Sequence, residues 1–245
     1  MSAPVGWVQE VFASFQGEGT HVGRRTVFVR TAGCSLRCRF CDTPLALVRT
    51  AQAELRLPRG LERVENPLDA TRIAAAVDVL DESARAWVSF TGGEPLEQAE
   101  FLASLAPRLR GRSIHLETAG VHAAEMEQLR PHVHFVAFDL KLDSVAHEGD
   151  RRADHRAFLA ACRGIDRIGK AIVNAEVDLD ELERLCALVG EEDPGIPIVL
   201  QPETPRGGGA PELPLALLER AHAVAARHVR EVRVIPQTHK FLRLP

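Results

Sequence analysis

The sequence predicts an α/β protein whose parallel sheet forms an open, partial (β/α)6 barrel. Short apolar runs alternate with helix-length segments along most of the chain, which is the pattern of βαβ units. The length of 245 residues suits one domain of the α/β-barrel size class, so we expect a single domain over residues 1–245. Only six such units are visible, fewer than the eight that close a full barrel.

The expected elements follow one another regularly after residue 25. Strands are expected at 26–30, 87–90, 113–117, 133–140, 167–173, 196–200 and 231–235, and helices at about 70–81, 97–109, 123–129, 154–162, 179–189 and 214–228. Segment 12–19 precedes the first expected strand, residues 50–67 read as an irregular insertion, and segment 235–245 ends the chain. Chemistry collects at the carboxyl ends of parallel strands in such folds, so we expect the site there.

Composition limits the classes of partner. A net charge of −4 gives no reason to expect binding to nucleic acid, and no apolar run reaches the length of a membrane span. The hydrophobic content of 45% is ordinary for a globular core. We therefore expect a cytoplasmic protein that acts on a small molecule.

Lysine is scarce in this chain. Of 30 basic residues only Lys141, Lys170 and Lys240 are lysines, and each lies at or just beyond an expected strand. Arginine is used at nearly all other basic positions of the chain. A lysine at these three positions is therefore weak evidence of a site that needs a compact ammonium group.

Three cysteines carry the clearest chemical signal. Cys34, Cys38 and Cys41 form a C-x3-C-x2-C motif after an expected strand, and Phe40 precedes the third cysteine. A [4Fe–4S] cluster needs one ligand per iron, so three thiolates leave one iron open to a small molecule. Reductive cleavage of S-adenosylmethionine requires such an open iron, and the motif predicts a radical S-adenosylmethionine enzyme.

Two other interpretations of the cysteines are less favoured. A structural zinc site needs four ligands at paired spacings, and the nearest spare candidate, His21, has no paired partner. A disulfide scaffold is not favoured either, because the chain has only five cysteines and this number is odd. Cys162 and Cys186 lie on the apolar sides of expected helices and read as small buried side chains.

A glycine-rich turn, Thr-Gly-Gly-Glu-Pro at 91–95, follows the strand at 87–90. Paired glycines permit close backbone approach, and on their own they fit an ordinary strand-to-helix turn. Together with the cysteine motif, this turn resembles the glycine-rich segment of the radical S-adenosylmethionine superfamily. The resemblance implies that Gly93 and Glu94 contact the methionine part of the cofactor.

Polar groups at further strand ends complete the expected cofactor site. Glu117 suits ribose hydroxyls, although it alternatively caps a loop, and the segment 201–203 suits the adenine edge. A charge at a strand end is more often a site residue than a buried accident, because an unpaired buried charge is costly. The expected cofactor-binding residues are Phe40, Cys41, Asp42, Gly93, Glu94, Glu117, Lys141, Gln201, Pro202 and Glu203.

Four motifs together narrow the family. They are Ser-x-Gln-Gly-Glu-Gly at 14–19, the cysteine motif continued by Asp42 and Thr43, the turn at 91–95, and Pro-Gln-x-His-Lys at 236–240. Their combination resembles the 7-carboxy-7-deazaguanine synthase family of radical enzymes in the queuosine and 7-deazapurine pathway, from Phe12 to Pro245.

The resemblance implies a specific reaction. The substrate is 6-carboxy-5,6,7,8-tetrahydropterin, an adenosyl radical takes hydrogen from its C6, and 7-carboxy-7-deazaguanine and ammonia are formed. The implied cofactors are a [4Fe–4S] cluster, S-adenosylmethionine used catalytically, and Mg²⁺. The implied partners are an electron donor such as flavodoxin or ferredoxin and a second copy of the chain in a homodimer.

The same resemblance assigns the substrate site. Arg30 offers a planar fork for the substrate carboxylate, and Thr43 offers a hard oxygen ligand to Mg²⁺. Two local alternatives stay open, namely that Thr43 caps its loop and that Arg30 pairs with a local acid such as Asp42. The implied substrate-binding residues are Phe15, Gln16, Gly17, Glu18, Arg30, Thr91, His239 and Pro245.

Three other functions share some of these sequence features. A glycyl-radical enzyme activase shares the cysteine spacing but needs a groove for a peptide. A simple iron–sulfur electron carrier leaves the glycine-rich turn unexplained, and a zinc-binding interaction module is the least favoured.

Overall fold

A ten-stranded open sheet organises the protein in a computed structural model that describes residues 3–205 and 209–245. The strand order is β12-β11-β10-β9-β8-β7-β3-β2-β4-β5, and every neighbouring pair from β3 to β12 is parallel. These seven strands are β3 (Arg25–Thr31), β7 (Trp87–Gly92), β8 (Ile114–Thr118), β9 (Phe135–Asp139), β10 (Asp166–Val173), β11 (Ile198–Pro202) and β12 (Val232–Val234). All seven predicted strands are present, and the predicted parallel, unclosed sheet is confirmed.

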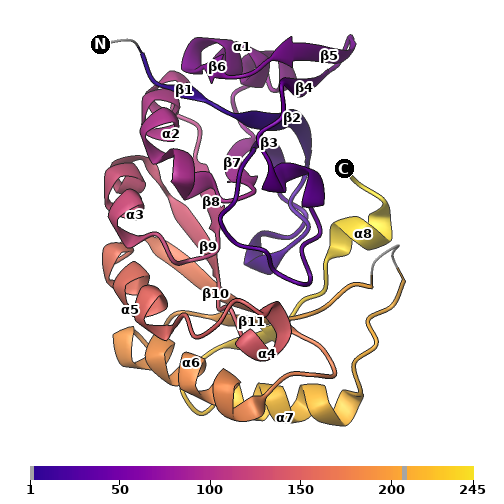
Figure 1. The fold of residues 1–245 in the computed structure, drawn as a ribbon, viewed down its shortest axis with the longest axis vertical. Coiled ribbons are helices and arrows are strands. Elements are labelled where there is room, and N and C mark those ends of the chain that lie inside the picture. Colours follow the sequence, from indigo (N-terminus) through magenta and orange to yellow (C-terminus); the bar gives the residue numbers. More distant parts are fainter. Residues whose placement is uncertain (1–2, 206–208) are drawn as a thin grey trace.

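Helices connect the parallel strands and cover the outer side of the sheet (Figure 1). The six long ones are α1 (Ala70–Leu80), α2 (Ala99–Leu105), α3 (Ala123–Leu129), α5 (Arg152–Ala161), α6 (Leu179–Glu192) and α7 (Leu215–Ala225). Asp69 begins α1 and Asp178 begins α6, and each side chain accepts hydrogen bonds from backbone N–H groups of the first turn. The remaining helices are α4 (Asp143–Ala146), α8 (Thr238–Leu242), η1 (Gly19–His21), η2 (Pro44–Leu47), η3 (Pro95–Gln98), η4 (Ala106–Arg108) and η5 (Arg130–His132).

The helix expected at 97–109 is broken into three pieces. The 3₁₀ turn η3 precedes α2, and η4 follows it with Pro107 inside. Proline has no N–H and clashes with the preceding helical turn, so the regular helix ends before it.

The N-terminal segment before β3 forms a strand of its own. β2 (Val8–Phe15) pairs antiparallel with β3, and it covers the first half of the segment 12–19. β2 was not predicted, because burial does not alternate regularly along its eight residues and the strand therefore gives little periodic signal. A small sheet of β1 (Val5–Gly6) and β6 (Leu68–Asp69) lies beside α2 and α1.

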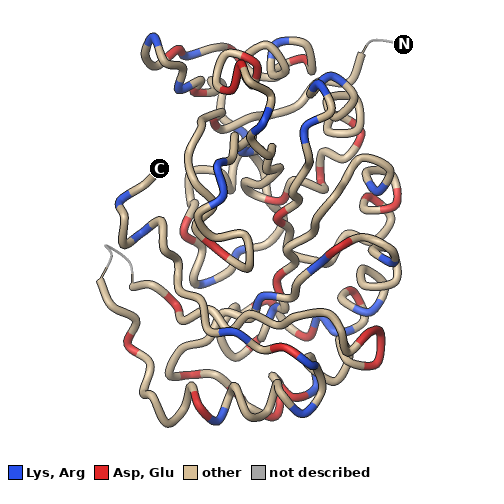
Figure 2. The backbone as a smooth tube through the Cα atoms, turned by 180° about the vertical axis from the view of Figure 1, so that it is seen from behind, with Lys and Arg blue, Asp and Glu red and all other residues tan. Residues whose placement is uncertain are grey.

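The prediction of an irregular insertion at 50–67 is wrong. The segment forms a hairpin of β4 (Gln52–Leu57) and β5 (Gly60–Glu65), which extends the sheet beyond β2. Its inward face is apolar at alternate positions, while charged side chains occupy the other face and form ion pairs such as that of Arg63 with Glu54. Acidic and basic positions are interspersed along this hairpin and along the outer helices (Figure 2). The many charged residues of the hairpin obscure the alternation of apolar and polar residues that is typical of a strand.

The core lies between the sheet and its helices. Phe90, Phe138 and Leu116 from neighbouring strands are fully buried against apolar faces that include Leu102 and Phe158. The packing leaves the strand ends to carry polar groups. None of the helices in the described ranges is long and apolar enough to cross a membrane.

Candidate functional site

One cavity of about 440 Å³ opens at the carboxyl ends of the parallel strands. It is bounded by the cysteine loop, the glycine-rich turn, the N-terminal segment after β2 and the C-terminal segment from residue 237. Nearly all predicted site residues line it, namely Phe15, Gln16, Gly17, Glu18, Arg30, Cys34, Cys38, Phe40, Cys41, Asp42, Thr43, Thr91, Gly93, Glu117, Lys141, Gln201, Glu203, His239 and Pro245. Of the predicted set only Glu94 and Pro202 lie outside its wall.

The cysteine loop presents three free thiols to this cavity. Cys34, Cys38 and Cys41 are each partly buried, and a turn from Cys41 N–H to the Cys38 carbonyl, 3.0 Å, bends the loop between them. Burial raises the pKa of Cys34 to about 12 and also raises that of Cys38, so these two thiols hold their protons more strongly than a free cysteine does. Cluster iron binds thiolates, so loading the site must release protons. Three thiols on one wall fit a cluster that keeps one open iron.

The glycine-rich turn supports that loop. The Glu94 N–H donates to the Gly33 carbonyl, 2.9 Å, and the Gly33 N–H donates to the Ala46 carbonyl, 2.8 Å. A Cβ atom at Gly93 would collide with both of these carbonyl oxygens. Gly92 has φ +134°, a backbone conformation that L side chains rarely adopt. Gly93 is therefore required by the close approach of the cysteine loop, and Gly92 by its positive φ and by the backbone of Thr31 on β3.

Glu94 lies behind the cavity wall. Its carboxylate accepts hydrogen bonds from Thr118 Oγ1 at 2.7 Å, from Ala119 N–H at 2.8 Å and from Leu96 N–H at 3.0 Å. Burial raises the pKa of Glu94. The side chain joins the end of β7 to the end of β8 and does not line the cavity, so its contact with the methionine part of the cofactor stays a prediction.

The side-chain amide of Gln16 forms hydrogen bonds that fix the conformation of residues 16–18. Its Nε2 donates to Glu117 Oε1 at 3.0 Å, and its Oε1 accepts from the Gly17 and Glu18 N–H groups at 2.8 and 3.0 Å. Ser89 Oγ donates to the same Glu117 oxygen at 2.6 Å, and Gln16 Nε2 also lies 3.2 Å from His115 Nδ1. Gln16 lines the cavity, but its amide is used to hold residues 16–18. The supporting roles of Ser89 and His115 were not predicted, because neither residue belongs to a motif.

All three lysines of the chain line the cavity. Lys141 Nζ lies 2.8 Å from Asp139 Oδ2, and Lys170 Nζ lies 2.6 Å from Glu18 Oε2 and 3.3 Å from Asp139 Oδ1. The scarcity of lysine was thus a usable signal. Lys170, absent from the predicted binding residues, lies in the site.

The C-terminal segment closes over the N-terminal one. Gln237 Nε2 donates to Glu18 Oε1 at 2.7 Å and to Asp42 Oδ2 at 3.0 Å, and the Thr238 N–H donates to the Gly17 carbonyl at 2.9 Å. A Cβ at Gly17 would collide with the His239 ring, so this position needs a residue without a side chain. Gln237, another residue that the predictions omitted, therefore links three segments around the cavity.

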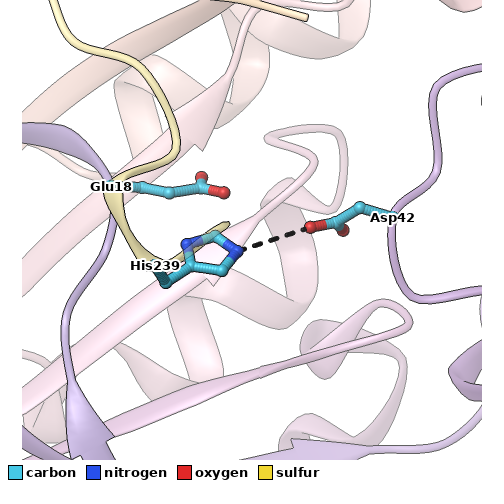
Figure 3. A group of neighbouring side chains, drawn as sticks. All are labelled: Glu18, Asp42 and His239. Atoms are coloured by element: carbon cyan, nitrogen blue, oxygen red, sulfur yellow. Dashed lines mark ion pairs between the residues drawn. The ribbon is translucent and has the colours of Figure 1, made fainter. Parts of the chain in front are cut away.

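Glu18, Asp42 and His239 converge from these three segments (Figure 3). Their potential ligand atoms lie within 4.8 Å of one another, and His239 Nε2 lies 3.9 Å from Asp42 Oδ2. Lys170 pairs with Glu18, and Lys240 Nζ lies 3.3 Å from Asp42. Each carboxylate already has a cation beside it, which favours an ion-pair network over a metal site at this group.

The local alternative for Arg30 is confirmed with a different partner, and the one for Thr43 is wrong. Arg30 Nε pairs with a local acid, but the acid is Glu10, whose Oε1 lies 3.0 Å away, and not Asp42. Thr43 lies at the start of η2, but its hydroxyl makes no capping hydrogen bond. Both residues line the cavity.

The comparisons with known proteins agree with this geometry. Residues 28–174 match the model of the radical SAM superfamily. A 7-carboxy-7-deazaguanine synthase from Geobacter sulfurreducens is 36% identical, over 99% of this chain and 99% of that protein. Another from Archaeoglobus fulgidus is 33% identical, over 95% of this chain and 96% of that protein. The chain belongs to the 7-carboxy-7-deazaguanine synthase family.

A solved structure shares the fold of this family member. QueE from Escherichia coli matches with a TM-score of 0.61 at 20% identity, and the match covers 96% of this chain and 95% of that one. Membership of the radical SAM superfamily implies a [4Fe–4S] cluster and S-adenosylmethionine, as the cysteine motif predicted. It removes the simple electron carrier and the zinc module from consideration.

Three histidines near the site, His115 and His155 buried and His21 half-buried, predict how the free energy of unfolding depends on pH. Burial lowers the pKa of His115 to about 3 and that of His21 and His155 to about 4. In the unfolded chain each takes up a proton near pH 6.5. The unfolded state therefore binds more protons as pH falls below about 6.5, and the free energy of unfolding decreases.

We expect the urea midpoint of the cluster-free protein to be level from pH 8 to 7 and to fall steadily below about pH 6.5. His115→Gln should reduce that slope. A midpoint that stays level down to pH 4 would contradict the assignment of these histidines as buried and neutral.

Proposed function

We propose that this chain converts 6-carboxy-5,6,7,8-tetrahydropterin to 7-carboxy-7-deazaguanine with loss of ammonia, as a radical S-adenosylmethionine carbon–nitrogen lyase. One observation carries the proposal. The three thiols and the polar N- and C-terminal segments, which lie about 200 residues apart in sequence, meet around a single cavity. When bound, the [4Fe–4S] cluster supplies the electron for reductive cleavage of S-adenosylmethionine.

The cofactor half of the cavity lies beside the cysteine loop. Phe40, Gly93 and Glu117 offer an apolar face, a bare backbone and a ribose-directed carboxylate, and Gln201 and Glu203 offer an edge for adenine. Lys141 Nζ lies 5.0 Å from the centre of the Phe40 ring, which joins β9 to the cysteine loop. These residues would hold the cofactor beside the cluster.

The substrate half is more polar. Glu18 is a fixed acceptor for the N–H donors of a pterin, and Arg30 is a donor fork for the carboxylate. Thr91, His239 and Pro245 line the same half from other elements. The residues would hold the substrate so that its C6 faces the cofactor half.

The Thr43 hydroxyl suits Mg²⁺, which commonly takes few protein ligands and completes its shell with substrate and water. The Thr43 hydroxyl makes no capping hydrogen bond to η2, which supports this assignment. A flavodoxin or a ferredoxin would supply the electron, and a homodimer is the proposed assembly.

Anaerobic turnover tests the function. The reconstituted protein is reduced with dithionite and given S-adenosylmethionine, Mg²⁺ and 6-carboxytetrahydropterin, and the products are identified by mass spectrometry. We expect 7-carboxy-7-deazaguanine in excess over 5′-deoxyadenosine. Cofactor cleavage without that product would overturn the substrate assignment and bring forward a glycyl-radical enzyme activase.

Arg30→Met tests the carboxylate contact. Removal of a charged hydrogen bond costs about 1.5–3 kcal/mol, so KM for the pterin should rise about tenfold to a hundredfold while affinity for S-adenosylmethionine is retained. Arg56→Met is the matched control, because Arg56 pairs with the other oxygen of Glu10 and lies outside the cavity wall. Equal effects of the two variants on KM would show that Arg30 acts through Glu10 alone.

A further inference from the structure

Lys170 is a buried cation between two carboxylates. It lies on β10, its side chain is 8% exposed, and its Nζ reaches Glu18 Oε2 at 2.6 Å and Asp139 Oδ1 at 3.3 Å. Asp139 is also held by Lys141 at its other oxygen, 2.8 Å away. Lys170 therefore supplies the ion pair that holds Glu18 from the sheet.

Glu18 is gripped at both oxygens. Lys170 occupies Oε2 from the sheet, and Gln237 Nε2 occupies Oε1 at 2.7 Å from the C-terminal segment. A carboxylate has about four acceptor positions, so roughly two remain for a ligand in the cavity that Glu18 lines. The two partners leave the carboxylate one orientation.

Lys170 also keeps the Glu18 carboxylate ionised. Burial alone would raise the pKa of Glu18, but the Lys170 ammonium, with Gln237 and His239, holds it at about 2. Asp42 and His239 face Glu18 from the cysteine loop and from α8. Without the ammonium, burial and the nearby Asp42 would both favour the protonated acid.

We propose that Lys170 is a positioning residue that presents Glu18 to a substrate edge carrying two adjacent N–H donors, and that it thereby selects against rings lacking the amino donor. The proposal rests on the proposed function, because a pterin carries such an edge in its ring N–H and its 2-amino group. A carboxylate that accepts two parallel N–H bonds rejects an analogue with an oxygen in place of the amino group, since that oxygen is left facing an acceptor.

The test compares reconstituted holoenzymes of wild type, Lys170→Met, Lys170→Arg and Gln237→Leu. For each, kcat and KM are measured for 6-carboxytetrahydropterin and for the corresponding 2-oxo compound, 6-carboxytetrahydrolumazine. Affinity for S-adenosylmethionine is measured by calorimetry. Arg167→Met is the matched control, because Arg167 is an equally buried cation of β10 that pairs with Glu192 outside the cavity.

We expect Lys170→Met to raise KM for the pterin about tenfold to a hundredfold and to lower its preference over the 2-oxo compound, with S-adenosylmethionine affinity within about twofold of wild type. Lys170→Arg should recover part of both, since it restores the charge. Gln237→Leu should shift the preference in the same direction by a smaller factor, and Arg167→Met should leave it unchanged.

Two results would overturn the proposal. One is an unchanged preference in both Lys170→Met and Gln237→Leu. The other is a Lys170→Met protein that fails to fold, combined with a wild-type preference in Gln237→Leu. Failure of the proposed function is a separate result, because it appears as absence of 7-carboxy-7-deazaguanine with the wild-type protein.

Discussion

Replacing Cys38 with alanine is expected to abolish cleavage of S-adenosylmethionine. The cavity presents three thiols, and the remaining cysteines of the chain, Cys162 and Cys186, are buried outside it. Loss of one thiol leaves two ligands for a cluster of four irons, and no nearby cysteine replaces it. We expect bound iron to fall well below about four per chain and turnover to fall below detection.

Iron analysis, electron paramagnetic resonance of the reduced protein and turnover measure this outcome. Cys186→Ala is the matched control, since Cys186 is a fully buried cysteine within the apolar core of α6. It should lose some thermal stability and keep its iron and activity. A Cys38→Ala protein with a full cluster and wild-type turnover would show that another residue ligates the iron.

Replacing Gly93 with alanine is expected to displace the cysteine loop. The added methyl group would meet the carbonyl oxygens of Gly33 and Ala46, which are backbone atoms and cannot rotate away. Such overpacking costs about 1–3 kcal/mol, and relief requires the loop or the turn to move. Since Gly93 also lines the cavity, we expect at least about a tenfold loss of S-adenosylmethionine affinity together with lower cluster occupancy.

Calorimetric titration with S-adenosylmethionine and iron analysis of the purified variant measure these two effects. Gly195→Ala is the control, because a Cβ there meets only the side chain of Asp193, on an exposed loop. If Gly93→Ala keeps full affinity and iron, the contact between turn and loop has enough slack to absorb a methyl group, and our account of the glycine is wrong.

Local pattern was sufficient for most of the sheet. The seven parallel strands are short, apolar and connected by helices, and each of these features is visible within a few residues of sequence. β2 and the hairpin of β4 and β5 were not predicted, because polar and charged side chains interrupt their apolar pattern. In such strands the burial of one face is set by what packs on it, which a window of sequence does not contain.

The site shows the same division. The motifs named the right segments, because strand ends of a parallel sheet meet at one edge whatever fills the core. They did not predict the direction of each side chain. Glu94 turns behind the wall to Thr118 and Ala119, and Gln16 turns its amide to Glu117 and to its own segment.

What the sequence by itself determined is the chemistry on offer and its approximate place: three thiols in one loop, a glycine-rich turn after the next parallel strand, and polar segments near both ends of the chain. Only the tertiary structure decided how those groups are paired. The bonds of Glu18 to Lys170 and to Gln237 join residues 152 and 219 positions apart. Such contacts form because burial obliges each charged or polar group to find a partner among whatever the folded chain brings near.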